Sequence, residues 1–219
     1  MKKLLIPAFV ALLLAGCGGE SLEDKIRKAK GKGHISLHLY GNEITDLRPL
    51  AEFTNLVRLD LEQNRITDLT PLAGLTKLKR LYLDHNQIKD VTPLAGLTNL
   101  EELVLDENQI TDLMPLAELT NLRELHLYKN QITDVSPLAE LTNLEVLNLS
   151  DNQITYLKPL AELAKLRRLN LRDNEITDVT PLAGLTNLKT LWLTRNQITE
   201  DQKEMIKKAL PDCDISFNY

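Results

Sequence analysis

The sequence predicts a solenoid of the α/β class, a right-handed arc with a parallel sheet on its concave face and short helical or 3₁₀ segments on its convex face. Three observations predict this fold. From His34 onward the sequence repeats every 22 residues, in seven full units and a partial eighth. Leucine fills the fourth and sixth positions of each unit, and asparagine fills the ninth. Because one such unit cannot bury its own apolar face, the units must stack and share a core.

The composition restricts the classes of function. The chain has 219 residues, of which 43% are hydrophobic and 4% aromatic, and its formal net charge is −5. This charge argues against nucleic acid and anionic lipid as main partners, because both require concentrated positive charge. Two cysteines cannot form a disulfide scaffold, and four scattered histidines do not form a zinc module.

Residues 1–16 are typical of a secretory signal peptide. Two lysines precede an apolar stretch at 4–14, and small residues follow it. The segment Leu14-Ala15-Gly16-Cys17 resembles the lipobox of bacterial lipoproteins. That resemblance implies cleavage before Cys17 and acylation of Cys17 with fatty acids such as palmitate. Membrane attachment would then be through this lipid anchor.

Residues 17–33 are polar and rich in glycine and lysine, so we expect a lipidated tether and a short N-terminal cap. Lipoproteins that Gram-negative bacteria retain in the inner membrane usually carry aspartate after the acylated cysteine, where this chain has Gly18. The resemblance therefore implies a bacterial cell-envelope protein, lipid-anchored, and located at the outer membrane if the host is Gram-negative.

Each repeat unit begins with a short strand. Leucines alternate with variable residues at a period of two, as in Leu59 and Leu61, which indicates a strand with one buried face. The asparagine that follows can bond backbone groups where the chain turns, although asparagine also simply suits turns. We expect these side chains to form a column along the solenoid. The column comprises Asn42, Asn64, Asn86, Asn108, Asn130, Asn152, Asn174 and Asn196.

A proline follows each strand at a fixed offset, and in four units a hydroxyl residue precedes it. A hydroxyl N-cap followed by proline at the first helical position is typical of a short helix. We therefore expect the hydroxyls to cap short helices on the convex side. They are Thr70, Thr92, Ser136 and Thr180.

The repeats resemble the leucine-rich repeats of the bacterial internalin family. The segments that carry the resemblance include 108–113 (NQITDL) and 93–100 (PLAGLTNL). Residues 34–199 would form the repeats, and the resemblance implies a curved solenoid that binds through its concave face. After Ile198 the repeat ends, and residues 200–219 are expected to form a C-terminal cap. The cap would contain a helix at 201–210, an edge strand at 215–217 and Cys213 as a small buried hydrophobe.

The third, fifth, seventh and eighth positions of each unit should face the concave side, and these positions vary from unit to unit. We call them the concave strip. Aromatic residues beside charged ones are typical of a recognition patch, although variable positions can also simply drift. We expect acidic residues in units two to four and basic residues later, including Arg172 and Arg195. The residues nominated for protein binding are Tyr40, Tyr82, Asp84, His85, Asp106, His126, Tyr128 and Trp192.

We predict that this protein is not an enzyme and needs no cofactor. Glu102 and Glu124 lie at the same phase of adjacent units, but an open strip offers no water-poor pocket for a catalytic carboxylate pair. The acidic column Glu62, Asp84 and Asp106 offers oxygen ligands for Ca²⁺, but a solvated column is the preferred interpretation.

His38 and His126 are four units apart, too far to share a metal ion. Because catalysis and metal binding are not expected on the concave strip, a protein is the preferred ligand and a glycan the second choice. The oligomeric state is not determined by the sequence, and we expect a monomer. The alternative function is that of a structural envelope lipoprotein without a dedicated ligand.

Overall fold

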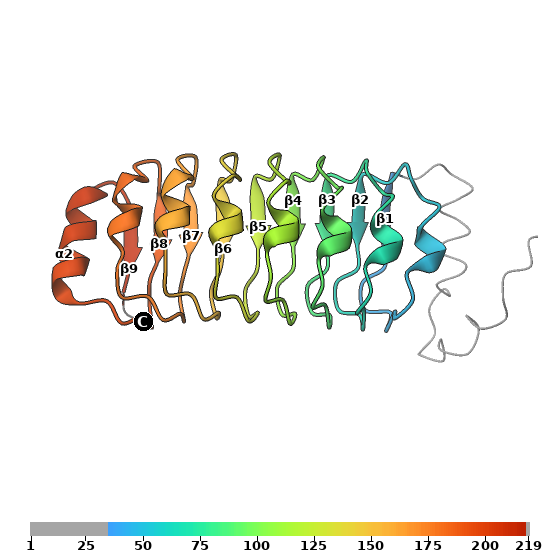
Figure 1. Cartoon of the computed structure of the whole chain (residues 1–219), viewed down its shortest axis with the longest axis horizontal. Helices are drawn as coiled ribbons and strands as arrows, with labels where there is room; N and C mark the ends of the chain where they lie inside the picture. The colour runs from blue at the N-terminus through green and yellow to red at the C-terminus, as the bar shows by residue number, and fades with distance from the viewer. Residues whose placement is uncertain (1–34, 218–219) are drawn as a thin grey trace, which may run out of the picture.

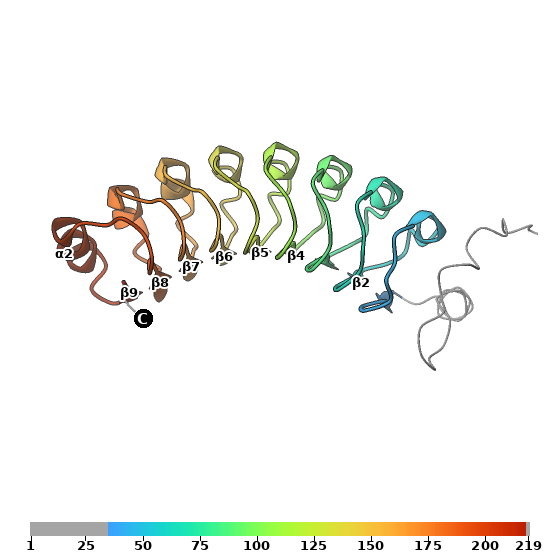
Figure 2. The same cartoon turned by 90° about the horizontal axis from the view of Figure 1, so that it is seen from below.

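The computed structural model describes residues 35–217, so the predicted signal peptide, Cys17 and the tether lie outside the described residues. In this part nine parallel strands form one sheet in chain order, and Figure 1 shows them side by side. Figure 2 shows the strands on the inner side of an arc and the short helices on its outer side. The predicted solenoid is confirmed. The strands are β1 Ser36–His38, β2 Arg58–Asp60, β3 Arg80–Tyr82, β4 Glu102–Val104, β5 Glu124–His126, β6 Val146–Asn148, β7 Arg168–Asn170, β8 Thr190–Trp192 and β9 Asp214–Ser216.

The register of the sheet is set by one leucine in the middle of each repeat strand. Leu59 pairs with Leu81, and Leu81 pairs with Leu103, all fully buried. The residues on either side of each leucine are half-buried or exposed, because side chains alternate between the two faces of a strand. Burying one leucine stabilises the fold by about 1.5–3 kcal/mol, and every coil contributes several. A one-residue slip would turn all of these leucines to solvent, so the register is strongly specified.

One buried asparagine joins each coil to the one before it. Asn108 Nδ2 donates to the Leu105 and Asp106 carbonyls of its own coil and to the Leu83 carbonyl of the preceding coil, at 3.0–3.1 Å. Its Oδ1 accepts the Ile88 amide at 3.0 Å. The same pattern repeats from Asn64 to Asn174, and each of these side chains is buried. The first rung differs, since Asn42 is only half-buried and its side chain donates to the Tyr40 carbonyl.

A second column of asparagines lies on the surface and is not anticipated by the sequence interpretation above. The last residue of four units donates to a carbonyl 23 residues earlier, for example Asn99 Nδ2 to Thr76 O at 2.8 Å. These side chains are exposed or half-buried, so each bond contributes less than its buried counterpart. The four residues are Asn99, Asn121, Asn143 and Asn187.

The convex segments are 3₁₀ helices, and the predicted hydroxyl caps are wrong. Thr70 is the first residue of its helix rather than the N-cap. The N-cap residue is Leu69, and no side chain makes a capping hydrogen bond there. The amide of Thr70 instead donates to Asp68 Oδ1 at 2.8 Å, because an aspartate two residues earlier reaches it in a local turn. Equivalent bonds precede five other helices. The helices are η2 Arg48–Leu50, η3 Thr70–Leu72, η4 Thr92–Leu94, η5 Met114–Leu116, η6 Ser136–Leu138, η7 Lys158–Glu162 and η8 Thr180–Gly184.

The helix α2 (Glu200–Ala209) and the strand β9 cover the C-terminal end of the solenoid. Thr199 caps α2, Ile206 is fully buried, and Gln202 Oε1 accepts the Val179 amide at 2.9 Å. The strand β9 continues the parallel sheet one residue earlier in sequence than expected. Cys213 is half-buried, and burial raises the pKa of its thiol. No helix among the described residues combines the length and apolarity needed to span a bilayer.

Candidate binding surface

The nominated residues all reach the surface, and six of them lie on three neighbouring coils. Tyr82 and His126 end the strands β3 and β5, and Asp84, Asp106 and Tyr128 follow their strands by two residues. Their side chains are half-buried, because they stand above the leucines on an open sheet. The sixth residue is His85, which is exposed. The coils of β3, β4 and β5 therefore gather aromatic, acidic and imidazole side chains on the strip, with Val104 in register between Tyr82 and His126.

The other two nominated residues lie outside this central group. Tyr40 follows β1 and is 62% exposed. Trp192 ends β8, where it pairs in register with Asn170 and Ser216. They lie near opposite ends of the sheet, separated from the central residues by the coil of β2 on one side and the coils of β6 and β7 on the other.

The eighth position of each repeat lies in a tight turn beyond the strand. His85 there has a φ of 53°, and Gln63, Glu107 and Lys129 have similar positive values. Gly41 holds this position in the first described coil with a φ of 65°. As a result the His85 ring lies beside the eighth-position side chain of the next coil, with Nδ1 at 3.5 Å from Glu107 Oε1.

His126 connects two acidic residues on the strip. Its Nε2 lies 2.8 Å from Glu124 Oε1 on the same strand, and its Nδ1 lies 4.0 Å from Asp106 Oδ2 on the preceding coil. Asp106 Oδ1 also accepts the Tyr128 amide at 2.6 Å. This arrangement holds His126, Asp106 and the backbone of Tyr128 together across two coils.

Tyr82 lies among charged neighbours that the nomination did not include. The Arg58 guanidinium lies 4.7 Å from the centre of the Tyr82 ring, within cation–π range. Burial, followed by the hydrogen bond and charge of Glu102, raises the pKa of Tyr82 to about 12. Arg58 and Glu102 occupy the third position of the repeat, in the coils before and after the coil of Tyr82. That shared phase is the sequence signal that could have identified them.

The acidic column is less solvated than the sequence interpretation expected. Asp84 is half-buried, and burial, followed by the charge of Glu62, raises its pKa to about 6. Burial also raises the pKa of Asp106. Among residues 35–217 no group of three or more His, Cys, Asp or Glu side chains has an arrangement that could hold a metal ion.

The two carboxylates considered for catalysis, and set aside, do lie together, but each has its own partner. Glu102 and Glu124 are register partners on β4 and β5. Glu102 lies 3.3 Å from Arg80 Nε, and Glu124 bonds His126. Each carboxylate therefore has a polar partner at the surface.

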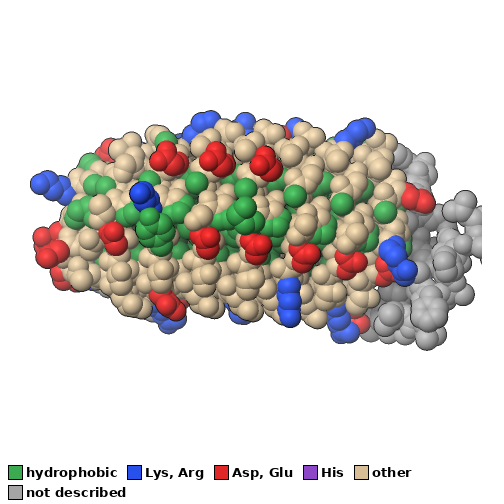
Figure 3. Space-filling model, viewed as in Figure 1, with side chains coloured by type: hydrophobic (Ala, Val, Ile, Leu, Met, Phe, Trp, Pro, Cys, Tyr) green, Lys and Arg blue, Asp and Glu red, His purple; other side chains and the backbone are tan. Residues whose placement is uncertain are grey.

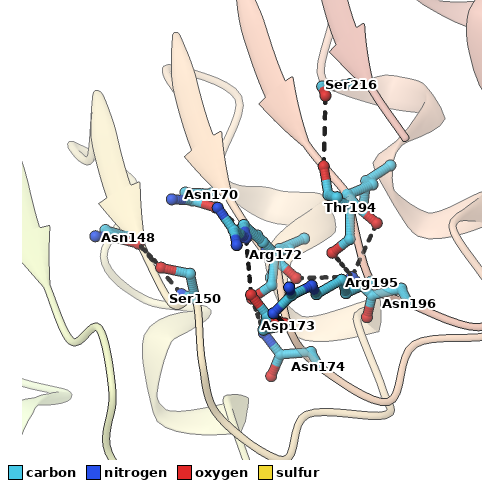
Figure 4. A network of polar contacts seen from close by, with 12 residues as sticks. Asn148, Ser150, Asn170, Arg172, Asp173, Asn174, Thr194, Arg195, Asn196 and Ser216 are labelled. Atoms are coloured by element: carbon cyan, nitrogen blue, oxygen red, sulfur yellow. Dashed lines mark hydrogen bonds and ion pairs between the residues drawn. The ribbon is translucent and has the colours of Figure 1, made fainter. Parts of the chain in front are cut away.

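The later coils carry less free positive charge than the sequence interpretation expected. Figure 4 shows Arg172 and Arg195 directed toward Asp173, at 2.8 and 3.1 Å. In the same view Ser150 donates to Asn148 Oδ1 at 2.7 Å, and Thr194 lies 3.4 Å from Ser216. Asp173 therefore offsets part of the positive charge of these two arginines, while Arg168 on the same strip is exposed.

Comparison with known proteins gives a consistent family assignment. A model of leucine-rich repeats, in two copies, matches residues 35–74, 76–118, 120–162 and 164–203. The chain is similar to the crystal structure of internalin C2 from Listeria monocytogenes, with 38% identity and a TM-score of 0.84 over 90% of this chain and 92% of that chain. A search of curated protein sequences gave no match.

Two more distant structures also share the fold. One is a leucine-rich repeat protein from Leptospira interrogans, with 29% identity and a TM-score of 0.63 over 83% of this chain and 60% of that chain. The other is the ectodomain of the Arabidopsis thaliana receptor kinase GASSHO1/SCHENGEN3, in complex with CASPARIAN STRIP INTEGRITY FACTOR 2. It has 26% identity and a TM-score of 0.70 over 84% of this chain and 24% of that chain.

Proposed function

This chain belongs to the leucine-rich repeat family, and we propose that it binds another protein through the concave strip. One observation carries the proposal. Tyr82, His126 and Tyr128 stay at the surface of the strip, although the coils beneath them are filled by leucine. Aromatic side chains that the core does not need, beside charged groups, are the composition of a recognition surface.

The geometry of the strip also supports a macromolecular partner. The sheet is open and gently curved, and its backbone is fixed on both sides by neighbouring coils. A rigid surface of this kind loses little conformational entropy when a partner docks. The related plant ectodomain was crystallised in complex with another factor, which is consistent with this use of the fold.

Two variants of the chain provide a direct test. Tyr82→Ala/Tyr128→Ala removes aromatic groups from the strip, and Met114→Ala/Tyr156→Ala removes the exposed Met114 (64%) and Tyr156 (58%), which lie outside the strip. We expect one enriched partner in pull-downs from envelope extracts. Its recovery should fall at least tenfold with the first variant and remain unchanged with the second. Equal recovery with all three proteins would instead support a structural envelope role without a dedicated ligand.

We further propose that the protein is held at the bacterial cell envelope by a lipid on Cys17. The lipobox-like segment 14–17 supports this proposal. Metabolic labelling with a fatty-acid analogue should label the wild-type chain and fail to label Cys17→Ala. Labelling of both chains, or of neither, would contradict it.

A further inference from the structure

The seventh position of three successive coils presents like charges on the concave strip. Glu62, Asp84 and Asp106 are two residues beyond register-paired positions of β2, β3 and β4. All three are half-buried, and the charge of Glu62 acts on Asp84. Repulsion between neighbouring carboxylates at this depth makes the column unfavourable in the protein alone.

At several other phases adjacent coils place opposite charges side by side, and the like-charged Glu102 and Glu124 have Arg80 and His126 as neighbours. Arg65 pairs with Glu43 at 2.9 Å, Lys79 with Glu101 at 2.7 Å, and Lys129 with Glu107 at 2.8 Å. Within residues 35–217 no such cation lies within ion-pair distance of Glu62 or Asp84. Asp106 has the His126 ring at 4.0 Å and accepts the Tyr128 amide. Among the described residues, Glu62 and Asp84 therefore lack the lysine or arginine partner that these other carboxylates have.

The strip beside this column already binds one cation through an aromatic ring. Arg58 lies over Tyr82, which precedes Asp84 by two residues. This contact is independent of the carboxylates, and it shows that the tyrosine face of the strip accepts a guanidinium group. Tyr128 presents a second half-buried ring two residues beyond His126.

We propose that the partner docks a basic segment, rich in lysine or arginine, on Glu62, Asp84 and Asp106 beside Tyr82 and Tyr128. This inference rests on the proposed function and names the chemistry of the partner. Cations from the partner would supply the charge that the column lacks, and the aliphatic and planar parts of their side chains would pack on the rings. The later coils, which carry Arg168, Arg172 and Arg195, would contact a less basic part of the same partner.

A hexalysine peptide provides a defined probe, with hexaglutamate as the charge-reversed control. The test variant of the full chain is Glu62→Gln/Asp84→Asn/Asp106→Asn. The matched control is Glu118→Gln/Glu140→Gln/Glu162→Gln, which removes the same charge at the same 22-residue spacing from exposed positions within or after the outer helices. Figure 3 shows that acidic side chains also lie in rows on this outer face. The single variant Asp84→Asn is included in case the triple variant does not fold.

We expect hexalysine to bind wild type and the control variant equally, and to bind the test variant at least tenfold more weakly. Amide shifts in NMR spectra should be confined to coils with residues 58–130. Equal weakening in both triple variants, or no binding of hexalysine to wild type, would overturn the inference. If Tyr82→Ala/Tyr128→Ala abolishes capture of the native partner and the acidic variant does not, the proposed function stands and this inference fails.

The affinity should also depend on pH. A cation favours ionised Asp84, whose surroundings include Glu62, His85 and Asp106, with His126 and Glu107 acting on Asp106. Hexalysine binding should therefore tighten as pH rises from 5 to 7 and release protons near pH 6. Calorimetry in buffers of different ionisation enthalpy measures this release. A pH-independent affinity in wild type would contradict binding of the cations at Asp84.

Discussion

At the residue scale, one asparagine in each coil hydrogen-bonds with its side chain to backbone groups of the turn that have no backbone partner. Asn108 accepts one amide and donates to three carbonyls, in two coils at once. No other side chain has this short stem with both donors and an acceptor. Aspartate, which has an acceptor alone, could not donate to the carbonyls.

Replacing Asn108 with alanine should lower the free energy of unfolding by about 1–3 kcal/mol, because buried backbone groups lose their partners. Chemical denaturation measures the change. Asn99→Ala provides the matched control, since it removes one exposed bond to Thr76 and should cost less. A loss of only a few tenths of a kcal/mol for Asn108→Ala would contradict the role of this column.

A second residue-scale prediction concerns Asp84. Its folded-state pKa of about 6 lies above the ordinary value, so folding favours the protonated form. Its stabilising contribution is present below about pH 4 and is lost as pH rises through 6. Asp84→Asn should therefore raise the free energy of unfolding at pH 7 by on the order of 1 kcal/mol, after allowance for solvent screening.

This gain should vanish near pH 4, and unfolding in urea at several pH values checks it. Asp212→Asn, at an exposed position, should show no pH-dependent gain. If the Asp84→Asn gain were the same at pH 4 and pH 7, the assigned cause would be incorrect.

At the element scale, the short outer helices depend on aspartates that precede them. Asp112 Oδ1 accepts the first amide of η5 at 2.8 Å. The sixth unit has the exposed Tyr156 in place of this aspartate, and a phenol offers no carboxylate to the amide of Lys158. The helix η7 therefore begins without the bond that its neighbours have.

We expect Asp112→Ala to lower the free energy of unfolding by about 0.5–1 kcal/mol, as the loss of a helix cap does. Asp112→Asn keeps the acceptor oxygen and should cost much less. Tyr156→Asp should stabilise the protein by up to about 1 kcal/mol, because it gives η7 the aspartate–amide bond that the neighbouring helices have. Thermal and denaturant unfolding compare the three variants, and an unchanged stability for Asp112→Ala would rule out the capping role.

At the scale of the whole molecule, an open solenoid must cover its ends. The helix α2 buries Ile206 against the last coil, and β9 continues the sheet beyond β8. Without this cap the leucines of the last coil would meet water, and the edge of β8 would offer unpaired backbone groups to another chain.

Ile206→Ala should lower the free energy of unfolding by about 2–5 kcal/mol through cavity formation. Removal of residues 200–219 should lower the melting temperature and cause concentration-dependent self-association. Light scattering after size-exclusion chromatography measures the second effect. Lys208→Ala, at an exposed position of α2, is the control and should change neither quantity. A monomeric truncated chain of unchanged stability would show that the cap is dispensable.

The elements show where sequence interpretation was sufficient and where it was not. The 22-residue spacing was enough to predict the strands, their parallel order and their buried leucines, because stacking is the only way to cover each unit. The helix caps were assigned to hydroxyls such as Thr70, yet Asp68 provides the bond. Both residue types cap helices, and only the backbone path decides which side chain reaches the amide.

For the candidate site, the sequence by itself determined which residues share a phase, and so which ones face the concave side. Only the tertiary structure decided how those residues interact. It placed Arg58 over Tyr82, Asp173 beside two arginines of the later coils, and Asp84 at a depth that raises its pKa. The physical reason is that periodicity fixes the direction of a side chain, whereas its charge state and partners depend on distances between coils that are far apart in sequence.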